Sequence, residues 1–356
     1  MVSLDLAKFA LSTYAIHGLR FLLAVVILKD ISSFENLNIQ FYNELMTSLN
    51  VLLFVGTMHI GKLFLLREKK ALVCDDSFRL LTLLVLLLGI ISALVYSGPG
   101  VVLKIGYALL MPLYLLSHIT QAIRSSSGIY SFNNYIGLTI NLTLLGGWYF
   151  MKTVGLAEWV FFYFFVLSVV PILFELFVFK DLFVFLKDNL TITSISFVNS
   201  ETNLLSFFRL FISVLIVGSL YVYPHLIYKW LRILQDQLGI GENVLDYRYR
   251  VYIIELGLIS TFLVSYAIPR KWFAANWYNS AIKPIMSGFV ILIVYKFSAF
   301  LLIDDVFIYF DLIDWLFLYL LFSYSFILMN VLNDRYIALL LIPLDLLIIY
   351  LLLWLS

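Results

Sequence analysis

Basic and histidine side chains lie inside long apolar stretches of this sequence, where a buried charge is costly. His17 and Arg20 lie three residues apart, and His59 and Lys62 repeat this spacing, which places each pair on one face of a helix. A charge at the centre of a membrane helix costs about 2.5–3.5 kcal/mol on insertion scales, so such residues need an explanation. Together with Lys296 they form a candidate set of donors suited to a diphosphate and to sugar hydroxyls.

Buried carboxylates form the second group of candidates. Glu255 lies in an apolar stretch and could pair with Lys296 or act as an ion- or proton-coupling residue. Arg20 could instead pair with Glu255 or Glu175 as a structural strut, although Glu175 lies where it could simply reach water. Asp345 follows Pro343 in an apolar stretch, which indicates either a partner on another helix or a protonated carboxyl.

Signals for covalent catalysis are weak. The sequence has no His-Glu-x-x-His, no Gly-x-Ser-x-Gly and no phosphate loop, and we therefore expect no enzyme activity and no cofactor. Cys74 is the only cysteine, which excludes an internal disulfide and gives no metal-site spacing. The acidic cluster could imitate the outer site of a membrane glycosyltransferase or form a solvated loop; it consists of Asp304, Asp305, Asp311 and Asp314.

The composition indicates the class of protein that must position these residues. Of 356 residues, 63% are hydrophobic and 13% are charged, against about 25% charged residues in soluble domains. The mean hydropathy is +1.01. No water-soluble fold could cover so much apolar surface, so the sequence predicts an all-α integral membrane protein. The net charge of +1 gives no reason to expect a nucleic-acid partner.

Apolar runs of about 20 residues, each long enough to cross a bilayer, predict about eleven or twelve transmembrane helices. Six runs precede the polar stretch at residues 180–203 and about five follow it. We therefore expect two pseudo-symmetric lobes around a central cleft, at residues 1–179 and 204–356, joined by a cytoplasmic connector. The predicted spans are residues 9–28, 41–66, 78–96, 101–123, 135–150, 156–179, 204–223, 251–268, 284–303, 312–329 and 336–355.

Lys and Arg residues favour an orientation in which the N-terminus is cytoplasmic. With that choice more of them fall in cytoplasmic segments, as the positive-inside rule requires. Residues 225–250 are an exception, because this segment is basic although the orientation places it outside. Its pattern predicts an amphipathic helix that either continues the seventh span or lies at the interface.

Two loops resemble those of a known family. Residues 27–37 contain Glu35-Asn36-Leu37 after the first apolar helix, and residues 238–247 contain Glu242-Asn243-Val244 after the seventh. Each loop leads into the second helix of its lobe. This pattern resembles polysaccharide and O-antigen flippases of the multidrug/oligosaccharidyl-lipid/polysaccharide exporter superfamily. The family usually has twelve to fourteen helices, and its first loop usually carries a glycine and a proline that are absent here.

The resemblance implies a flippase in the inner membrane that translocates a lipid-linked oligosaccharide by alternating access. Its partners would be that lipid-linked glycan and the bilayer, with other polysaccharide-assembly membrane proteins as further candidates. His17, Arg20, His59, Lys62 and Lys296 would then bind the substrate, and Glu255 would couple an ion. The alternatives are a membrane polymerase or glycosyltransferase of the same pathway, or a small-molecule exporter of the same superfamily.

Overall fold

The structure is a computed structural model, and it describes part of the chain. In the described ranges every regular element is a helix, so the predicted all-α class is confirmed there. The described residues are 4–33, 41–47, 49, 83, 86–91, 93–94, 100–126, 130–179, 216, 223–233, 245, 249, 252–257, 286, 290, 293, 312–332 and 336–355.

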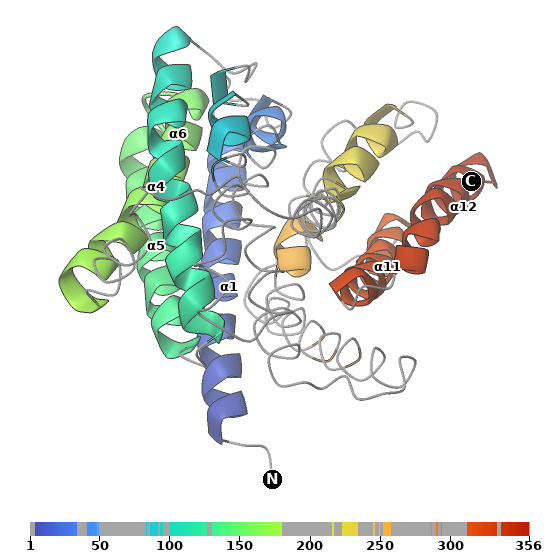
Figure 1. Cartoon of the computed structure of the whole chain (residues 1–356). Coiled ribbons are helices and arrows are strands. Elements are labelled where there is room, and N and C mark those ends of the chain that lie inside the picture. The colour runs from blue at the N-terminus through green and yellow to red at the C-terminus, as the bar shows by residue number, and fades with distance from the viewer. Residues whose placement is uncertain are drawn as a thin grey trace, which may run out of the picture. The chain divides into compact units, whose positions relative to one another are not determined.

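The named helices agree with the predicted spans and extend beyond several of them (Figure 1). Helix α1 begins before and ends after the predicted residues 9–28, and α5 begins earlier than the predicted residue 135. Polar residues at the ends of a span remain helical because the backbone hydrogen bonds continue past the apolar window. The elements are α1 (Leu4–Ser33), α4 (Val101–Ser126), α5 (Tyr130–Met151), α6 (Leu156–Phe174), η2 (Glu175–Phe179), α11 (Leu312–Leu332), η6 (Tyr336–Leu340) and α12 (Leu341–Leu355).

Three segments are long and apolar enough to cross a membrane by length and composition. They are Leu11–Ile31, Val101–His118 and Leu156–Phe177, and shorter apolar helices cover Leu316–Leu328 and Tyr336–Leu351. These spans are those of the described residues alone.

The chain divides into two compact units, which we call the first unit (residues 1–28 and 223–356) and the second unit (residues 29–222). The predicted division between lobes falls at residues 180–203, which lie outside the described residues. The two-lobe boundary therefore stays a prediction.

In the second unit, α4, α5 and α6 pack against one another (Figure 1). Two glycines allow aromatic rings to approach the helix backbones closely. A Cβ added to Gly106 of α4 would lie 2.7 Å from Cε2 of Phe161, and one added to Gly147 of α5 would overlap the ring of Phe162. The rings of Trp148 and Trp159 meet edge to face with centroids 5.1 Å apart. Both glycines therefore position α6 by their lack of a side chain.

The connection between α5 and α6 is a short turn that ends at Gly155. This residue has φ 152°, in the region that favours glycine, and its carbonyl accepts a hydrogen bond from the amide of Trp159 at 3.0 Å. Glu158 lies in the first turn of α6, where a negative charge complements the helix dipole. At the other end, α6 passes into the π-helix η2, and Glu175 is fully buried there. The expectation that Glu175 reaches water is wrong.

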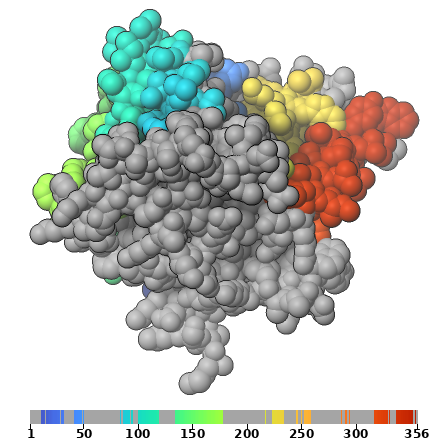
Figure 2. All heavy atoms as spheres, in the orientation of Figure 1, coloured from blue at the N-terminus to red at the C-terminus, as the bar shows by residue number. Residues whose placement is uncertain are grey.

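In the first unit, α12 has an apolar exposed face and a buried polar residue. Asp345 and Ile349 are buried, whereas Leu344, Leu347 and Leu351 are exposed. The atoms of α11 and α12 are the red spheres in Figure 2. A soluble helix has the opposite pattern, so α12 has the character of a helix whose outer face contacts lipid.

Candidate functional site

Helix α1 brings two predicted site residues, His17 and Arg20, to a glycine in the helical residues 252–257. His17 is buried and Arg20 is half-buried. A Cβ added to Gly257 would lie 3.7 Å from Cε1 of His17 and 3.9 Å from Nη1 of Arg20. The absence of a side chain at Gly257 therefore leaves space beside the imidazole and the guanidinium. Their predicted proximity on one helix face is confirmed.

The same face of α1 carries polar atoms without hydrogen-bond partners among the described residues. These atoms are Nδ1 of His17 and Oγ1 of Thr13, four residues earlier and also buried. Leaving a buried donor or acceptor unsatisfied costs about 1–3 kcal/mol. Water, a polar ligand or a further side chain at this face would remove that cost.

Glu255, the predicted coupling residue, is buried two positions before Gly257. Tyr252, one turn earlier, is also buried, and lies within electrostatic range of both Glu255 and Asp345. The ring of Tyr252 stacks on Phe317 of α11, with centroids 4.7 Å apart and an interplanar angle of 16°. The segment 252–257 thus presents a carboxylate and a phenol within the first unit.

Asp345 has three hydroxyl partners in this unit. Its Oδ2 accepts hydrogen bonds from the hydroxyls of Tyr223, at 2.7 Å, and Ser323. Its Oδ1 accepts one from the hydroxyl of Tyr319 at 2.7 Å. These bonds to a charged acceptor contribute about 1.5–3 kcal/mol each, which is comparable in sum to the several kcal/mol that burying an ion costs. The alternative in which Asp345 finds helix partners is confirmed.

A histidine–tyrosine pair lies in the same unit. Nδ1 of His225 shares a hydrogen bond with the hydroxyl of Tyr249, and both residues are buried. The ring of Tyr249 stacks on Tyr228 with centroids 3.9 Å apart. Residues 223–233 are helical, as predicted for the start of the amphipathic segment.

The remaining predicted site residues lie outside the described residues. This applies to His59, Lys62 and Lys296, so their proposed roles in substrate binding stay predictions. It also applies to Asp304, Asp305 and Asp311 of the acidic cluster, while Asp314 lies in α11 without a described side chain. Among the described residues, no group of three or more His, Cys, Asp or Glu side chains could hold a metal ion.

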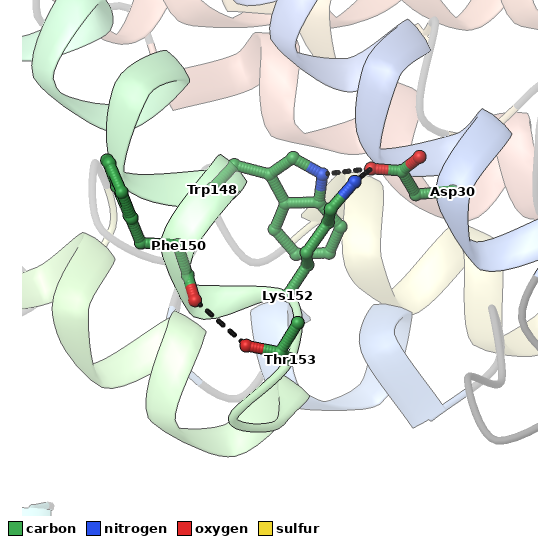
Figure 3. A network of polar contacts seen from close by, with 5 residues as sticks. All are labelled: Asp30, Trp148, Phe150, Lys152 and Thr153. Atoms are coloured by element: carbon green, nitrogen blue, oxygen red, sulfur yellow. Dashed lines mark hydrogen bonds and ion pairs between the residues drawn. The ribbon is translucent and has the colours of Figure 1, made fainter.

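A cross-helix polar cluster of the second unit is centred on Asp30 near the end of α1 (Figure 3). Oδ2 of Asp30 accepts hydrogen bonds from Nε1 of Trp148 at 2.8 Å and from Nζ of Lys152 at 3.2 Å. Lys152 also lies 5.1 Å from the ring centroid of Tyr149. The side chains of Lys152 and Asp30 are 20% and 21% exposed, and partial hydration lowers the energetic cost of the two charges. This cluster suits a structural tie at the end of a helix.

Comparison with other proteins adds no functional assignment. The chain matches no protein-family model, no curated protein and no solved structure.

Sequence reasoning did not identify the partners of Asp345. Tyr223, Tyr319 and Ser323 are common residue types in membrane helices, and only Asp345 itself was conspicuous in the sequence. A pairing across 122 positions, as between Tyr223 and Asp345, has no local sequence signal. The spacing of Tyr319 and Ser323, four residues apart on one helix face, was the one available indication.

Proposed function

We propose that the chain is a flippase that moves a lipid-linked oligosaccharide across the cytoplasmic membrane. It would be a multi-pass protein of about eleven or twelve transmembrane helices in two lobes, with a cytoplasmic N-terminus. No bond is made or broken, so the protein is not an enzyme and requires no cofactor. The three apolar helices long enough to cross a bilayer support the membrane location.

The observation that carries this proposal is the polar face of α1. His17 and Arg20 lie beside Gly257, and Nδ1 of His17 and Oγ1 of Thr13 have no hydrogen-bond partner among the described residues. A diphosphate offers several acceptor oxygens, and a guanidinium binds two of them in a fixed geometry. Sugar hydroxyls both donate and accept, and so would pair with a threonine hydroxyl and an imidazole nitrogen.

The proposed mechanism is alternating access. The diphosphate–sugar head binds the basic residues from the cytoplasmic side, and the two lobes then rock so that the cleft opens outward. The proposed binding residues lie in membrane helices rather than in an outer loop. They are therefore suited to guiding a head group through the membrane. Glu255 would couple this motion to an ion.

The test compares Arg20→Ala and Arg20→Lys with Lys104→Ala as a matched control. Lys104 is a half-buried cation in the first turn of α4, outside the proposed site. Leaflet-resolved labelling of the lipid-linked intermediate in cells would report each variant at equal protein levels. Arg20→Ala should trap the intermediate on the cytoplasmic leaflet, and Arg20→Lys should restore export in part because a point charge replaces the bidentate fork.

The same experiment separates this function from the enzyme alternative. If Arg20→Ala abolishes polymer while the intermediate still reaches the outer leaflet, the flippase proposal is wrong and a polymerase or glycosyltransferase takes its place. If Arg20→Ala and Lys104→Ala both leave export unchanged, the site itself is wrong.

A further inference from the structure

Helix α5 has an exposed face that is apolar in the middle and aromatic at both ends. Tyr135, in the second turn of the helix, is 62% exposed, and Tyr149, in the last turn, is 72% exposed. The exposed positions between these two tyrosines are Leu142 and Gly146. A helix that contacts water along its length carries polar residues on such a face. The exposed face of α5 instead has the pattern of a membrane helix, in which Tyr is enriched at both membrane–water interfaces.

The polar residues of α5 lower its mean hydropathy, and the helix is not among the three described segments that length and composition select as spans. Three of these residues lie between the tyrosines, and each donates a hydrogen bond to a carbonyl of its own helix. Thr139 donates to Tyr135 at 3.0 Å, Asn141 to Gly137 at 2.6 Å and Thr143 to Thr139 at 2.8 Å. Because these side chains are satisfied without water, they are compatible with a position inside the bilayer.

The spacing of the two tyrosines fits the thickness of a bilayer. Tyr135 and Tyr149 are 14 positions apart, which is about 21 Å along the helix axis. The hydrocarbon core is about 30 Å thick, and the 22 residues of α5 extend over about 33 Å. Tyrosine has an apolar ring and a polar tip, so its side chain can reach from the edge of the hydrocarbon toward the headgroups and make up the difference.

The end of α5 at Tyr149 also carries a charged pair. Asp30 and Lys152 lie 3.2 Å apart and are each about one-fifth exposed, and Nζ of Lys152 lies 5.1 Å from the ring centroid of Tyr149. Phe150 and Val154, close by in the chain, are 75% and 60% exposed. Partly exposed ions are costly inside the hydrocarbon, whereas headgroups and their water solvate them. Exposed aromatic rings beside a charged pair are therefore suited to the headgroup layer.

We propose that α5 crosses the bilayer with Tyr135 at one interface and Tyr149 at the other, and that Tyr149 anchors the end with Asp30 and Lys152 among the phospholipid headgroups. The partner of the exposed face is lipid along its whole length, with acyl chains against Leu142 and headgroups against Tyr149. This proposal depends on the membrane location and on no glycan, so a failure of the flippase proposal would not decide it.

The first test measures the depth of spin labels on the full chain in phospholipid nanodiscs, in a Cys74→Ala background. The labels are attached in turn at Tyr135→Cys, Leu142→Cys, Phe150→Cys and Val154→Cys. The ratio of accessibility to oxygen over accessibility to a water-soluble nickel chelate should be largest at position 142, fall toward both ends and be smallest at position 154. Low accessibility to both reagents at position 142 would mean that protein covers this face. A constant ratio along α5 would mean that the face contacts water, and either result would overturn the proposal.

The second test asks whether Tyr149 holds this end of α5 at the interface, with the label at Val154→Cys as the reporter. Tyr149→Leu removes the polar tip and should let the label move deeper, which raises the oxygen-to-nickel ratio. Tyr149→Trp should keep the wild-type ratio, because an indole is also apolar with a polar handle. Tyr350→Leu, at an exposed tyrosine of the first unit, is the matched control and should leave the ratio unchanged. Equal ratios in Tyr149→Leu and Tyr149→Trp would refute the anchor.

Discussion

The two units of the chain satisfy their buried polar groups in different ways. In the second unit the side chains of Ser117, Asn141 and Ser168 donate to carbonyls three or four residues earlier in their own helices. The first unit has such local bonds too, at Ser325 and Asn330. It adds cross-helix bonds to Asp345, of which those from Tyr223 and Ser323 are buried and that from Tyr319 is part-buried.

This difference concerns how each unit holds its helices together. A local bond to the same helix costs the fold little and constrains no neighbour, so it is compatible with a packed scaffold. A bond between two helices fixes one segment against another. Both units contain buried carboxylates, Glu255 and Asp345 in the first and Glu175 in the second, so the comparison assigns function to neither unit.

The largest expected effect is that of Asp345→Ala compared with Ser168→Ala. Removing the carboxylate leaves the hydroxyls of Tyr223, Tyr319 and Ser323 without their acceptor, and we expect a loss of about 3 kcal/mol in the free energy of unfolding. Ser168→Ala removes a local bond only and should change it by about 0.5 kcal/mol or less. Unfolding by denaturing detergent, followed by tryptophan fluorescence, measures both. Equal effects would remove the distinction between the units.

The next effect tests the packing of the second unit with two adjacent glycines of α5. A Cβ added to Gly146 would have no atom within 4 Å, whereas one added to Gly147 would overlap the ring of Phe162. Gly146→Ala should stabilise the unit by up to about 1 kcal/mol through helix propensity. Gly147→Ala should destabilise it by about 1–3 kcal/mol through overpacking. The same detergent titration applies, and Phe162→Leu should rescue Gly147→Ala if the clash is the cause.

A third prediction concerns the space beside His17 and Arg20. An Ala side chain at Gly257 would make ordinary contacts, at 3.7 and 3.9 Å, so Gly257→Ala should export glycan normally. Gly257→Leu should displace the imidazole or the guanidinium and reduce export about tenfold, equivalent to about 1.4 kcal/mol. Leaflet-resolved labelling at matched protein levels measures this effect. Equal export by the two variants would show that the face of α1 at Gly257 is not a substrate path.

The helices were predictable because their signal is local. Residues 156–179 form α6 and η2, and residues 336–355 form η6 and α12, as expected from apolar length alone. Helix ends were less predictable: Asp30, beyond the predicted span, contacts Trp148 and Lys152, which are remote in sequence. A hydropathy window contains no information on such contacts.

The site was predictable in part for the same reason. His17 and Arg20 stood out because charge is rare in an apolar helix, and their common face follows from the helical period. Their neighbour Gly257 could not be identified, since a glycine leaves no charge or polarity to detect. Tyr223 was equally inconspicuous, because a tyrosine hydroxyl acquires its role only from the position of Asp345.

The smallest expected effect tests the cross-helix ion pair of the second unit. Asp30 and Lys152 are both about one-fifth exposed, and their N–O distance is 3.2 Å. A double-mutant cycle with Asp30→Asn and Lys152→Met isolates the pair, because Asn keeps an acceptor for Nε1 of Trp148 and Met keeps the apolar stem of the lysine. We expect a coupling free energy of about 0.5–1 kcal/mol that decreases as salt is added, as for hydrated ion pairs. A coupling well above this range that is insensitive to salt would mean that Asp30 is shielded from water as Asp345 is. The contrast between the hydrated cross-helix pair of the second unit and the buried cross-helix bonds of the first would then fail.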